Sequence, residues 1–146
     1  MRLFKYFLAI SIGFLILSST ASGQCKRFTE KQCLPKLAPF TNNGQINNAT
    51  LFEGDSASLM MTFYSLLDYR LMVCSHEVLG AGVHFKVRDN DGNVLFNSQE
   101  AKKNYWDFRV NSTQDLVVNI IAPEKPKNLT SIPASGCVSI ILGFRE

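Results

Sequence analysis

The sequence predicts an antiparallel β-sandwich of jelly-roll type, with about eight strands and a short N-terminal strap. Three observations carry this prediction. Apolar and polar residues alternate with period two over most of the chain after residue 48, a hairpin signal lies within that part, and no strong helical period interrupts it. Strands with one buried and one wetter face show this alternation. Many short strands separated by turns are typical of sandwiches and jelly rolls.

The first 23 residues have the layout of a secretory signal peptide. Arg2 and Lys5 provide positive charge, an apolar run follows from Leu8 to Leu17, and Ala21-Ser22-Gly23 supplies small residues for cleavage. The run is short for a membrane span, which needs about 20 residues. We therefore expect residues 1–23 to be removed and the mature protein to be periplasmic or secreted, with an uncleaved membrane anchor as the minor alternative.

Length and charge indicate one globular domain and exclude a nucleic-acid-binding surface. Without Arg2 and Lys5, the 15 basic residues fall to 13 against 12 acidic residues, a net charge of +1. Nucleic-acid binding needs a clustered basic face, and the pairs Lys26-Arg27 and Lys102-Lys103 are too small to form one. We expect contact with a membrane only through the transient signal peptide.

Residues 24–47 differ from the rest and are expected to form a strap against the main domain. Lys26 to Cys33 can make one or two helical turns. Pro35 and Pro39 then favour an extended path, because proline fixes φ and lacks an N–H donor. Thr41-Asn42-Asn43-Gly44 has the composition of a turn.

Four cysteines, an even number, follow the predicted signal peptide. In an oxidising compartment an even count predicts two disulfides, with three possible connectivities. We favour Cys25–Cys33, which closes a short local loop, and Cys74–Cys137, which joins two distant strands. Free buried cysteines, which pack as small apolar groups, are the alternative.

Residues 48–146 are expected to form the sandwich domain. The segments that alternate with period two are 58–63, 69–74, 83–88, 105–110 and 137–144. The segment 116–121 is more continuously apolar, so we expect a central strand there that is covered on both faces. The clearest local signal runs from Phe85 to Phe96, where two apolar-polar runs flank Asp89-Asn90-Asp91-Gly92-Asn93. These turn residues tolerate positive φ, and the segment predicts a β-hairpin.

One group of residues has the chemistry of metal ligands. Cys74 and His76 share a face of one predicted strand, and the turn at 80–82 can bring His84 beside them. Sulfur and imidazole ligands suit zinc or copper. The competing roles are a disulfide for Cys74 and exposed strand ends for the histidines, and we expect no cofactor. Ser75-His76-Glu77 contains catalytic residue types, but neighbours on a strand point to opposite faces and cannot form a triad.

Three further features allow a binding role. Trp106, with Tyr105 and Asp107 on the opposite strand face, is a candidate for stacking on a sugar, although its parity with Phe108 favours the core. Other apolar side chains are candidates for a partner-binding patch or for places between the sheets: Met60, Tyr64 and Met72. N-glycosylation sequons begin at Asn48, Asn111 and Asn128.

The order of motifs resembles a family. A strand with Tyr69-Arg70-Leu71, the Asp91-Gly92 hairpin, Trp106-Asp107-Phe108 and a last strand opening with Gly136-Cys137-Val138 resemble small exported proteins of unassigned function from Gram-negative bacteria. Residues 49–144 are more loosely similar to the β-sandwich modules of the GOLD and bacterial pre-peptidase C-terminal type. Such modules are generally non-catalytic, and the resemblance implies an accessory or interaction role without catalytic residues.

We therefore expect a non-catalytic exported binding or accessory module that recognises a protein or a surface glycan. A small metal-binding or enzymatic domain that uses Cys74, His76 and His84 is the first alternative. A carbohydrate-binding module is the second.

Overall fold

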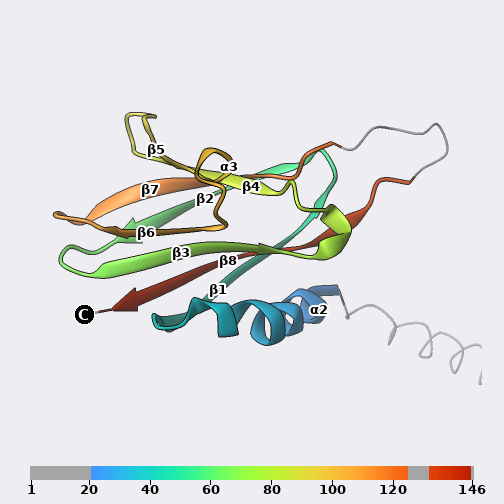
Figure 1. Cartoon of the computed structure of the whole chain (residues 1–146), viewed down its shortest axis with the longest axis horizontal. Coiled ribbons are helices and arrows are strands. Elements are labelled where there is room, and N and C mark those ends of the chain that lie inside the picture. The colour runs from blue at the N-terminus through green and yellow to red at the C-terminus, as the bar shows by residue number, and fades with distance from the viewer. Residues whose placement is uncertain (1–20, 125–131, 146) are drawn as a thin grey trace, which may run out of the picture.

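The strands of the protein form two four-stranded antiparallel sheets that pack face to face (Figure 1). The structure is a computed structural model and describes residues 21–124 and 132–145. The predicted antiparallel sandwich of about eight strands is confirmed. The expected signal peptide lies outside the described residues, except for its last three positions.

Each sheet mixes strands from distant parts of the chain. Sheet A has the order β1-β8-β3-β6, with the bounds Thr41–Phe52, Ser135–Arg145, Asp68–Ser75 and Tyr105–Arg109. Sheet B has the order β2-β7-β4-β5, with the bounds Ser56–Phe63, Gln114–Ile121, His84–Arg88 and Val94–Asn97. The central position predicted for residues 116–121 is confirmed, because β7 lies between β2 and β4. The expected cover on both faces is wrong, because the outward residues of β7 are only half-buried.

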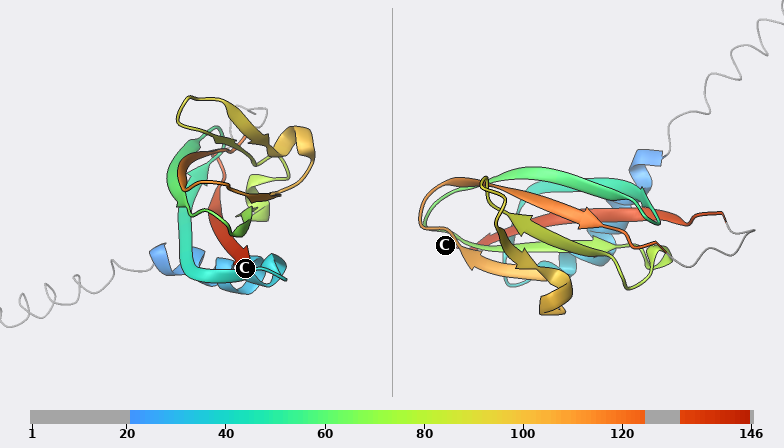
Figure 2. Two further views of the ribbon diagram at one scale, coloured as in Figure 1. Left: turned by 90° about the vertical axis from the view of Figure 1, so that its left-hand side faces the viewer. Right: turned by 90° about the horizontal axis from the view of Figure 1, so that it is seen from above.

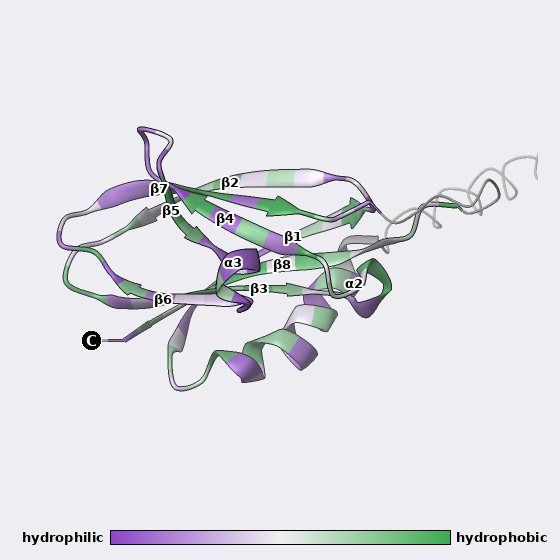
Figure 3. Cartoon of the chain, turned by 45° about the horizontal axis from the view of Figure 1, so that its top comes forward, coloured by the Kyte–Doolittle hydropathy of each residue, from purple (hydrophilic) through white to green (hydrophobic). Residues whose placement is uncertain are grey.

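The main core lies between the sheets. Inward-facing side chains come from every second residue, and Figure 3 shows this alternation of hydropathy along β4. Seven of these strand side chains are at most 1% exposed: Phe63, Leu71, Phe85, Val87, Leu116, Val118 and Val138. Each large apolar side chain buried in this way contributes roughly 1.5–3 kcal/mol relative to an exposed one. This burial, shared by both sheets, holds the sandwich together.

Three consecutive helical segments cover the outer face of sheet A (Figures 1 and 2). They are α2 (Ala21–Phe28), the π-helical η1 (Thr29–Cys33) and the 3₁₀-helical η2 (Leu34–Leu37), and together we call them the helical cover. Beneath them lies a second cluster of buried side chains: Cys33, Leu37, Met72, Cys74 and Ile141. Two shorter helices, η3 (Glu77–Leu79) and α3 (Ser98–Ala101), belong to connections.

The close contact between the helical cover and β8 depends on Gly143. A Cβ atom at that position would lie 2.7 Å from the Phe40 Cβ and 2.9 Å from the Leu37 Cγ. Pro35 lies in the first turn of η2, where its missing N–H is tolerated. The chain is therefore helical through Leu37, whereas the sequence favoured an extended path from Pro35.

The predicted disulfide pairing is wrong. Cys25 is bonded to Cys137, with Cα atoms 5.3 Å apart, and Cys33 to Cys74, with Cα atoms 5.9 Å apart. Cys25 and Cys33 both lie in the continuous helical cover, and at about 1.5 Å per residue they are roughly 12 Å apart, beyond the reach of one disulfide. In sheet A, Cys74 is opposite Ser139 and not opposite Cys137. Each sheet cysteine therefore bonds to the helical cysteine above it.

The polar segment predicted as a turn is a bulge inside β1. The register between β1 and β8 shifts between Asn42 and Ile46. Within it, the Gly44 N–H donates to Asn42 Oδ1 at 2.8 Å and the Gln45 N–H donates to Asn43 Oδ1 at 2.9 Å. Gly44 has φ +83°, which favours glycine. β1 thus begins at Thr41 and crosses the position at residue 47 where we expected the strap to end.

The hairpin predicted from Phe85 to Phe96 is confirmed, since β4 and β5 pair antiparallel. The Asp89 carboxylate accepts a hydrogen bond from the Asn93 backbone N–H at 2.8 Å and from the Asn93 amide Nδ2 at 2.9 Å. These bonds hold the pKa of Asp89 below its ordinary value, and the bond from the Asn93 side chain contributes most.

Over residues 21–124 and 132–145, no helix is long and apolar enough to cross a membrane.

Candidate partner-binding surface

The structure does not assemble the three predicted metal ligands. Cys74 is bonded to Cys33, so its sulfur is not available as a thiolate. His76 is exposed, and its Nδ1 accepts from the Val78 N–H at 3.4 Å as the N-cap of η3. The His84 Nδ1 lies 2.9 Å from the Gly82 carbonyl oxygen. In the part of the chain that the structure describes, no three His, Cys, Asp or Glu residues are grouped to hold a metal ion.

Trp106 belongs to the core face of sheet A. Its ring is stacked on Phe108 at 3.9 Å between centroids and on Phe96 at 5.5 Å, and it packs against the main core. Its role is therefore packing, as the strand parity favours, and the structure gives the sugar-stacking alternative no support at this residue.

Tyr105 and Asp107 lie on the outer face of sheet A and contact Arg70. The Arg70 guanidinium donates two hydrogen bonds of 2.7 Å to the Asp107 carboxylate. It also lies 4.6 Å from the ring centroids of both Tyr105 and Phe40. The hydrogen bond to Asp107 raises the pKa of Arg70 above its ordinary value. These groups tie Phe40, next to the helical cover, to the sheet.

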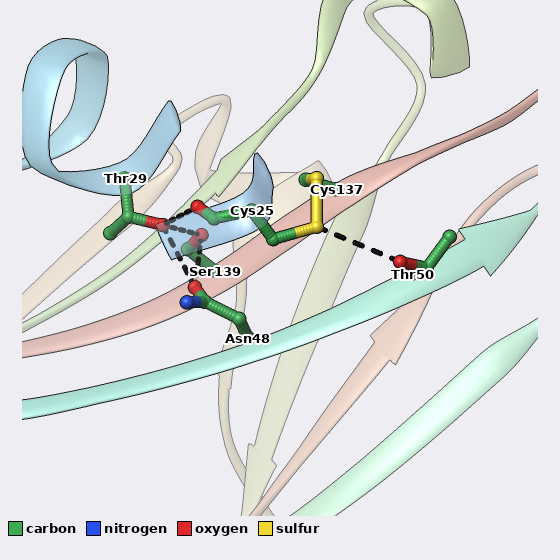
Figure 4. The surroundings of a disulfide bond; sticks show 6 residues. All are labelled: Cys25, Thr29, Asn48, Thr50, Cys137 and Ser139. Atoms are coloured by element: carbon green, nitrogen blue, oxygen red, sulfur yellow. Dashed lines mark hydrogen bonds between the residues drawn. A yellow bond between two sulfur atoms is a disulfide. The ribbon is translucent and has the colours of Figure 1, made fainter. Parts of the chain in front are cut away.

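A buried polar cluster fixes the other end of the helical cover, beside the Cys25–Cys137 disulfide (Figure 4). Thr29 and Ser139 are fully buried, with their hydroxyl oxygens 2.5 Å apart. Thr29 Oγ1 donates to the Cys25 carbonyl at 2.8 Å, and Ser139 Oγ donates to Asn48 Oδ1 at 2.7 Å. None of these partners is a general base, so Ser139 is not an activated nucleophile.

The sequons have different surroundings. The Asn48 side chain takes part in the buried polar cluster. Asn111 is exposed between β6 and β7, and Asn128 lies outside the described residues.

An uncharged groove, lined by both polar and apolar side chains, lies at the edge of the sandwich where β1 and β2 face each other. Its volume is about 490 Å³. We call it the β2 groove, and its lining is Asn43, Gln45, Met60, Met61, Thr62, Tyr64, Leu67, Tyr69, Leu142 and Phe144. Met60 is 64% exposed and Tyr64 is 62% exposed. These two members of the predicted patch therefore lie at the surface, whereas Met72 is buried beneath the helical cover.

Hydrogen bonds to its backbone fix the conformation of the loop that follows β2. The Tyr69 hydroxyl accepts from the Tyr64 N–H at 2.9 Å and donates to the Tyr64 carbonyl at 3.1 Å. The Leu66 N–H donates to the Val110 carbonyl at 3.2 Å, and the Leu66 carbonyl accepts from Arg109 Nη2 at 3.0 Å. The loop conformation is thus defined by hydrogen bonds at both residues.

This loop presents an apolar side chain to water in a strained conformation. Leu66 has φ +71°, which L-residues other than Asn and Asp seldom adopt, and its side chain is 69% exposed. Backbone strain of this kind costs about 1–3 kcal/mol and tends to occur at functional sites. Sequence reasoning missed Leu66, because no glycine or asparagine marks the positive φ there.

β2 itself is an unusual edge strand. It pairs with β7 on one side, has eight residues, and contains no charged residue and no proline. Natural proteins usually protect such edges with charges, prolines, bulges or short length. The other edges of this protein follow that rule: β1 has a bulge, and β5 and β6 have four and five residues.

The comparisons with known proteins add little. No family model matches the chain, and no curated protein matches it. Among solved structures, it is similar to the crystal structure of PliG from Aeromonas hydrophila, a periplasmic lysozyme inhibitor of g-type lysozyme. The TM-score is 0.49 at 5% sequence identity, over 69% of this chain and 85% of that chain. A likeness of this degree supports no argument about function, and the resemblance to GOLD and pre-peptidase modules stays a prediction. In the part of the chain that the structure describes, the fold defines the class as a β-sandwich with two disulfides and an edge strand, β2, that has no charge, proline or bulge.

Proposed function

We propose that this protein is a non-catalytic, exported binding module that holds an extended segment of a partner protein along β2. The observation that carries the proposal is the backbone-fixed loop that keeps Tyr64 and Leu66 exposed beside the β2 groove. Tyrosine is a residue type enriched at the energetic centres of protein interfaces. A loop already fixed in shape loses little conformational entropy when a partner binds.

The edge of β2 defines the chemistry of the partner. An edge strand has unpaired N–H and C=O groups, and an extended peptide satisfies them by adding a strand. Because β2 carries no charge, the matching segment is uncharged, with an apolar side chain at every second position to enter the β2 groove. Such a segment gains affinity from backbone hydrogen bonds and specificity from the side chains in the groove.

The disulfides support the exported location. All four cysteines are paired, two in the helical cover and two in sheet A. Structural disulfides persist in oxidising compartments and are rare in the cytosol.

A random peptide library displayed on phage tests the proposal. The oxidised protein should select peptides with alternating apolar residues. Met60→Lys and Tyr64→Ala should each weaken the binding of a selected peptide by roughly tenfold or more, as for hot-spot residues. Val94→Lys is the matched control, because Val94 is 50% exposed on the opposite edge strand of the same sheet. Selected peptides that bind all three variants equally well, or no selection at all, would overturn the proposal.

A second measurement tests the strand addition itself. Methylation of alternate backbone nitrogens of a selected peptide should abolish binding in one register and leave it intact in the other, because a strand pairs through every second residue. Sedimentation of the free protein at micromolar concentration should show a monomer. A dimer that Met60→Lys dissociates would make a second copy the occupant of the edge and contradict the proposal.

A further inference from the structure

A second hollow, of about 510 Å³, lies between the ends of β3, β4 and α3. This volume is within the usual range for small-molecule sites. Four basic side chains line it, and we call it the lysine hollow: Lys36, Lys102, Lys103 and His84. Its lining shares no residue with the β2 groove, so the following argument does not rest on the proposed function.

The charge of the lysine hollow is unbalanced. Among residues 21–124 and 132–145, no aspartate or glutamate is part of its lining. The ion pairs found among the described residues involve Lys26, Arg70, Arg109 and Arg145, and none of the three lysines of the hollow. The Lys103 ammonium lies 5.6 Å from the centroid of the Tyr105 ring, a contact that leaves its charge without a counter-ion. Like charges gathered around one space repel each other, and a bound anion offsets that repulsion.

The neutral groups around the hollow suit an anion as well. Ser75, Gln99 and Asn104 contribute polar side chains to its lining. His84 is oriented by the Gly82 carbonyl, 2.9 Å from Nδ1. Because a carbonyl accepts only, Nδ1 is the donor in this contact, and Nε2 of the neutral ring is an acceptor, so the donors for an anion are the lysine, serine and amide side chains.

Lys102 occupies a position that normally belongs to glycine. It is the residue directly after α3, with φ +52° and ψ +38°, and its N–H donates to the Ser98 carbonyl. Glycine or asparagine usually ends a helix in this left-handed conformation, because other side chains are strained there. Local packing does not account for a lysine at this position, since Lys102 is exposed.

The Cys33–Cys74 disulfide brings Lys36 to the hollow. Cys74 is part of its lining, and Lys36 follows Cys33 by one helical turn in the helical cover. A lysine from the helical cover is thereby held beside two lysines that follow α3. The backbone positions of the three lysines are thus brought together by the fold, and their exposed side chains can reach an anion in the hollow.

We propose that the lysine hollow is a binding site for a small molecule that carries phosphate or sulfate groups. Three ammonium groups provide the charge, and the serine and amide side chains donate hydrogen bonds to the oxyanion. Phosphate and sulfate share this chemistry, so the experiment includes both sources.

Calorimetric titration with pyrophosphate, at fixed ionic strength, tests the site in the oxidised protein. Binding should be saturable, and the double variant Lys102→Gln, Lys103→Gln should weaken it by about tenfold or more. Lys31→Gln is the matched control, because Lys31 is an exposed lysine of the same helical cover that does not line the hollow. Glucose 6-phosphate and glucose 6-sulfate, titrated in parallel, show which oxyanion binds more tightly.

Lys102→Gly separates ligand binding from a structural role. Glycine fits the left-handed backbone, so the melting temperature should stay the same or rise while pyrophosphate binding weakens. The proposal is overturned if no probe saturates at millimolar concentration, if Lys31→Gln weakens binding as much as the double variant, or if Lys102→Gly leaves the affinity unchanged.

Discussion

The two sheets have the same alternating sequence pattern, but their outer faces are in different surroundings. On sheet A, the outward residues Met72, Cys74, Ser139 and Ile141 are buried under the helical cover. On sheet B, the corresponding rows are exposed or half-buried and include Ser58, Thr62, Lys86 and Asn119. The outward row of side chains on a strand can therefore face either water, as on sheet B, or a second packed layer, as on sheet A.

Removal of the disulfides should have the largest effect on this contrast. In the chain-entropy model, loops of 112 and 41 residues correspond to about 5 and about 4 kcal/mol of stabilisation. Both double variants should have a lower free energy of unfolding in urea. The loss should be larger for Cys25→Ala with Cys137→Ala than for Cys33→Ala with Cys74→Ala. Hydrogen exchange should speed up in the helical cover and stay slow in β7. If both variants were as stable as the native protein, the helical cover would be held by packing alone.

The second prediction compares one apolar side chain on each outer face. Ile141 is fully buried beneath the helical cover, whereas Val117 on β7 is half-buried. Ile141→Ala should lower the free energy of unfolding by about 2–5 kcal/mol, and Val117→Ala by less than about 1 kcal/mol. Urea denaturation measures both, and similar losses would contradict a second core under the cover.

The third prediction compares two serines. Ser139 is fully buried in the polar cluster of Figure 4, and Ser58 on sheet B is exposed beside Asn119. Ser139→Ala should cost about 1–3 kcal/mol, because it removes a partner of buried polar groups. Ser58→Ala should stay within about 0.5 kcal/mol, as expected of surface positions. Thermal unfolding of the two variants gives the comparison directly.

The smallest effect is expected at the β4–β5 turn of sheet B. The pKa of Asp89 is lowered in the folded state by its hydrogen bonds to Asn93. Its stabilising effect is therefore present above the ordinary value of 3.8 and is lost as the pH falls through the folded-state pKa. Asp89→Asn should be slightly less stable than the native protein near neutral pH, and the difference in urea midpoint should vanish in acid. A difference that does not depend on pH would contradict this assignment.

The strands and turns could be predicted because their signals are local. Alternation marks the buried face of each strand, and Asp-Gly or Asn-Gly sequences mark backbone that needs positive φ. The bulge at Gly44 shows a limit of this reasoning: Asx-turn residues were recognised, but not that the strand continues through them. Whether a turn ends a strand depends on the partner strand, here β8, which is distant in sequence.

The disulfide pairing could not be predicted for the same reason, and of the helical cover only one or two turns over residues 26–33 were expected. The proximity of Cys25 to Cys33 in sequence favoured a local bond, whereas the helix directs both sulfurs down onto sheet A. The candidate surfaces were only partly accessible. Met60 and Tyr64 could be recognised as candidate surface residues. The left-handed conformations of Leu66 and Lys102 could not, because the glycine that usually marks a positive φ is absent at both positions.

The bond between Cys25 and Cys137 has a consequence for how the protein matures. Synthesis delivers Cys25, Cys33 and Cys74 before Cys137, so Cys33 and Cys74 emerge while the final partner of Cys25 is still missing. A bond between Cys25 and Cys33 formed in that interval has to be exchanged through a mixed disulfide before the native pair can form. A catalyst of thiol exchange in the compartment of this protein should therefore accelerate maturation from any Cys25–Cys33 intermediate, whereas formation of Cys33–Cys74 first leads to the native pairs directly.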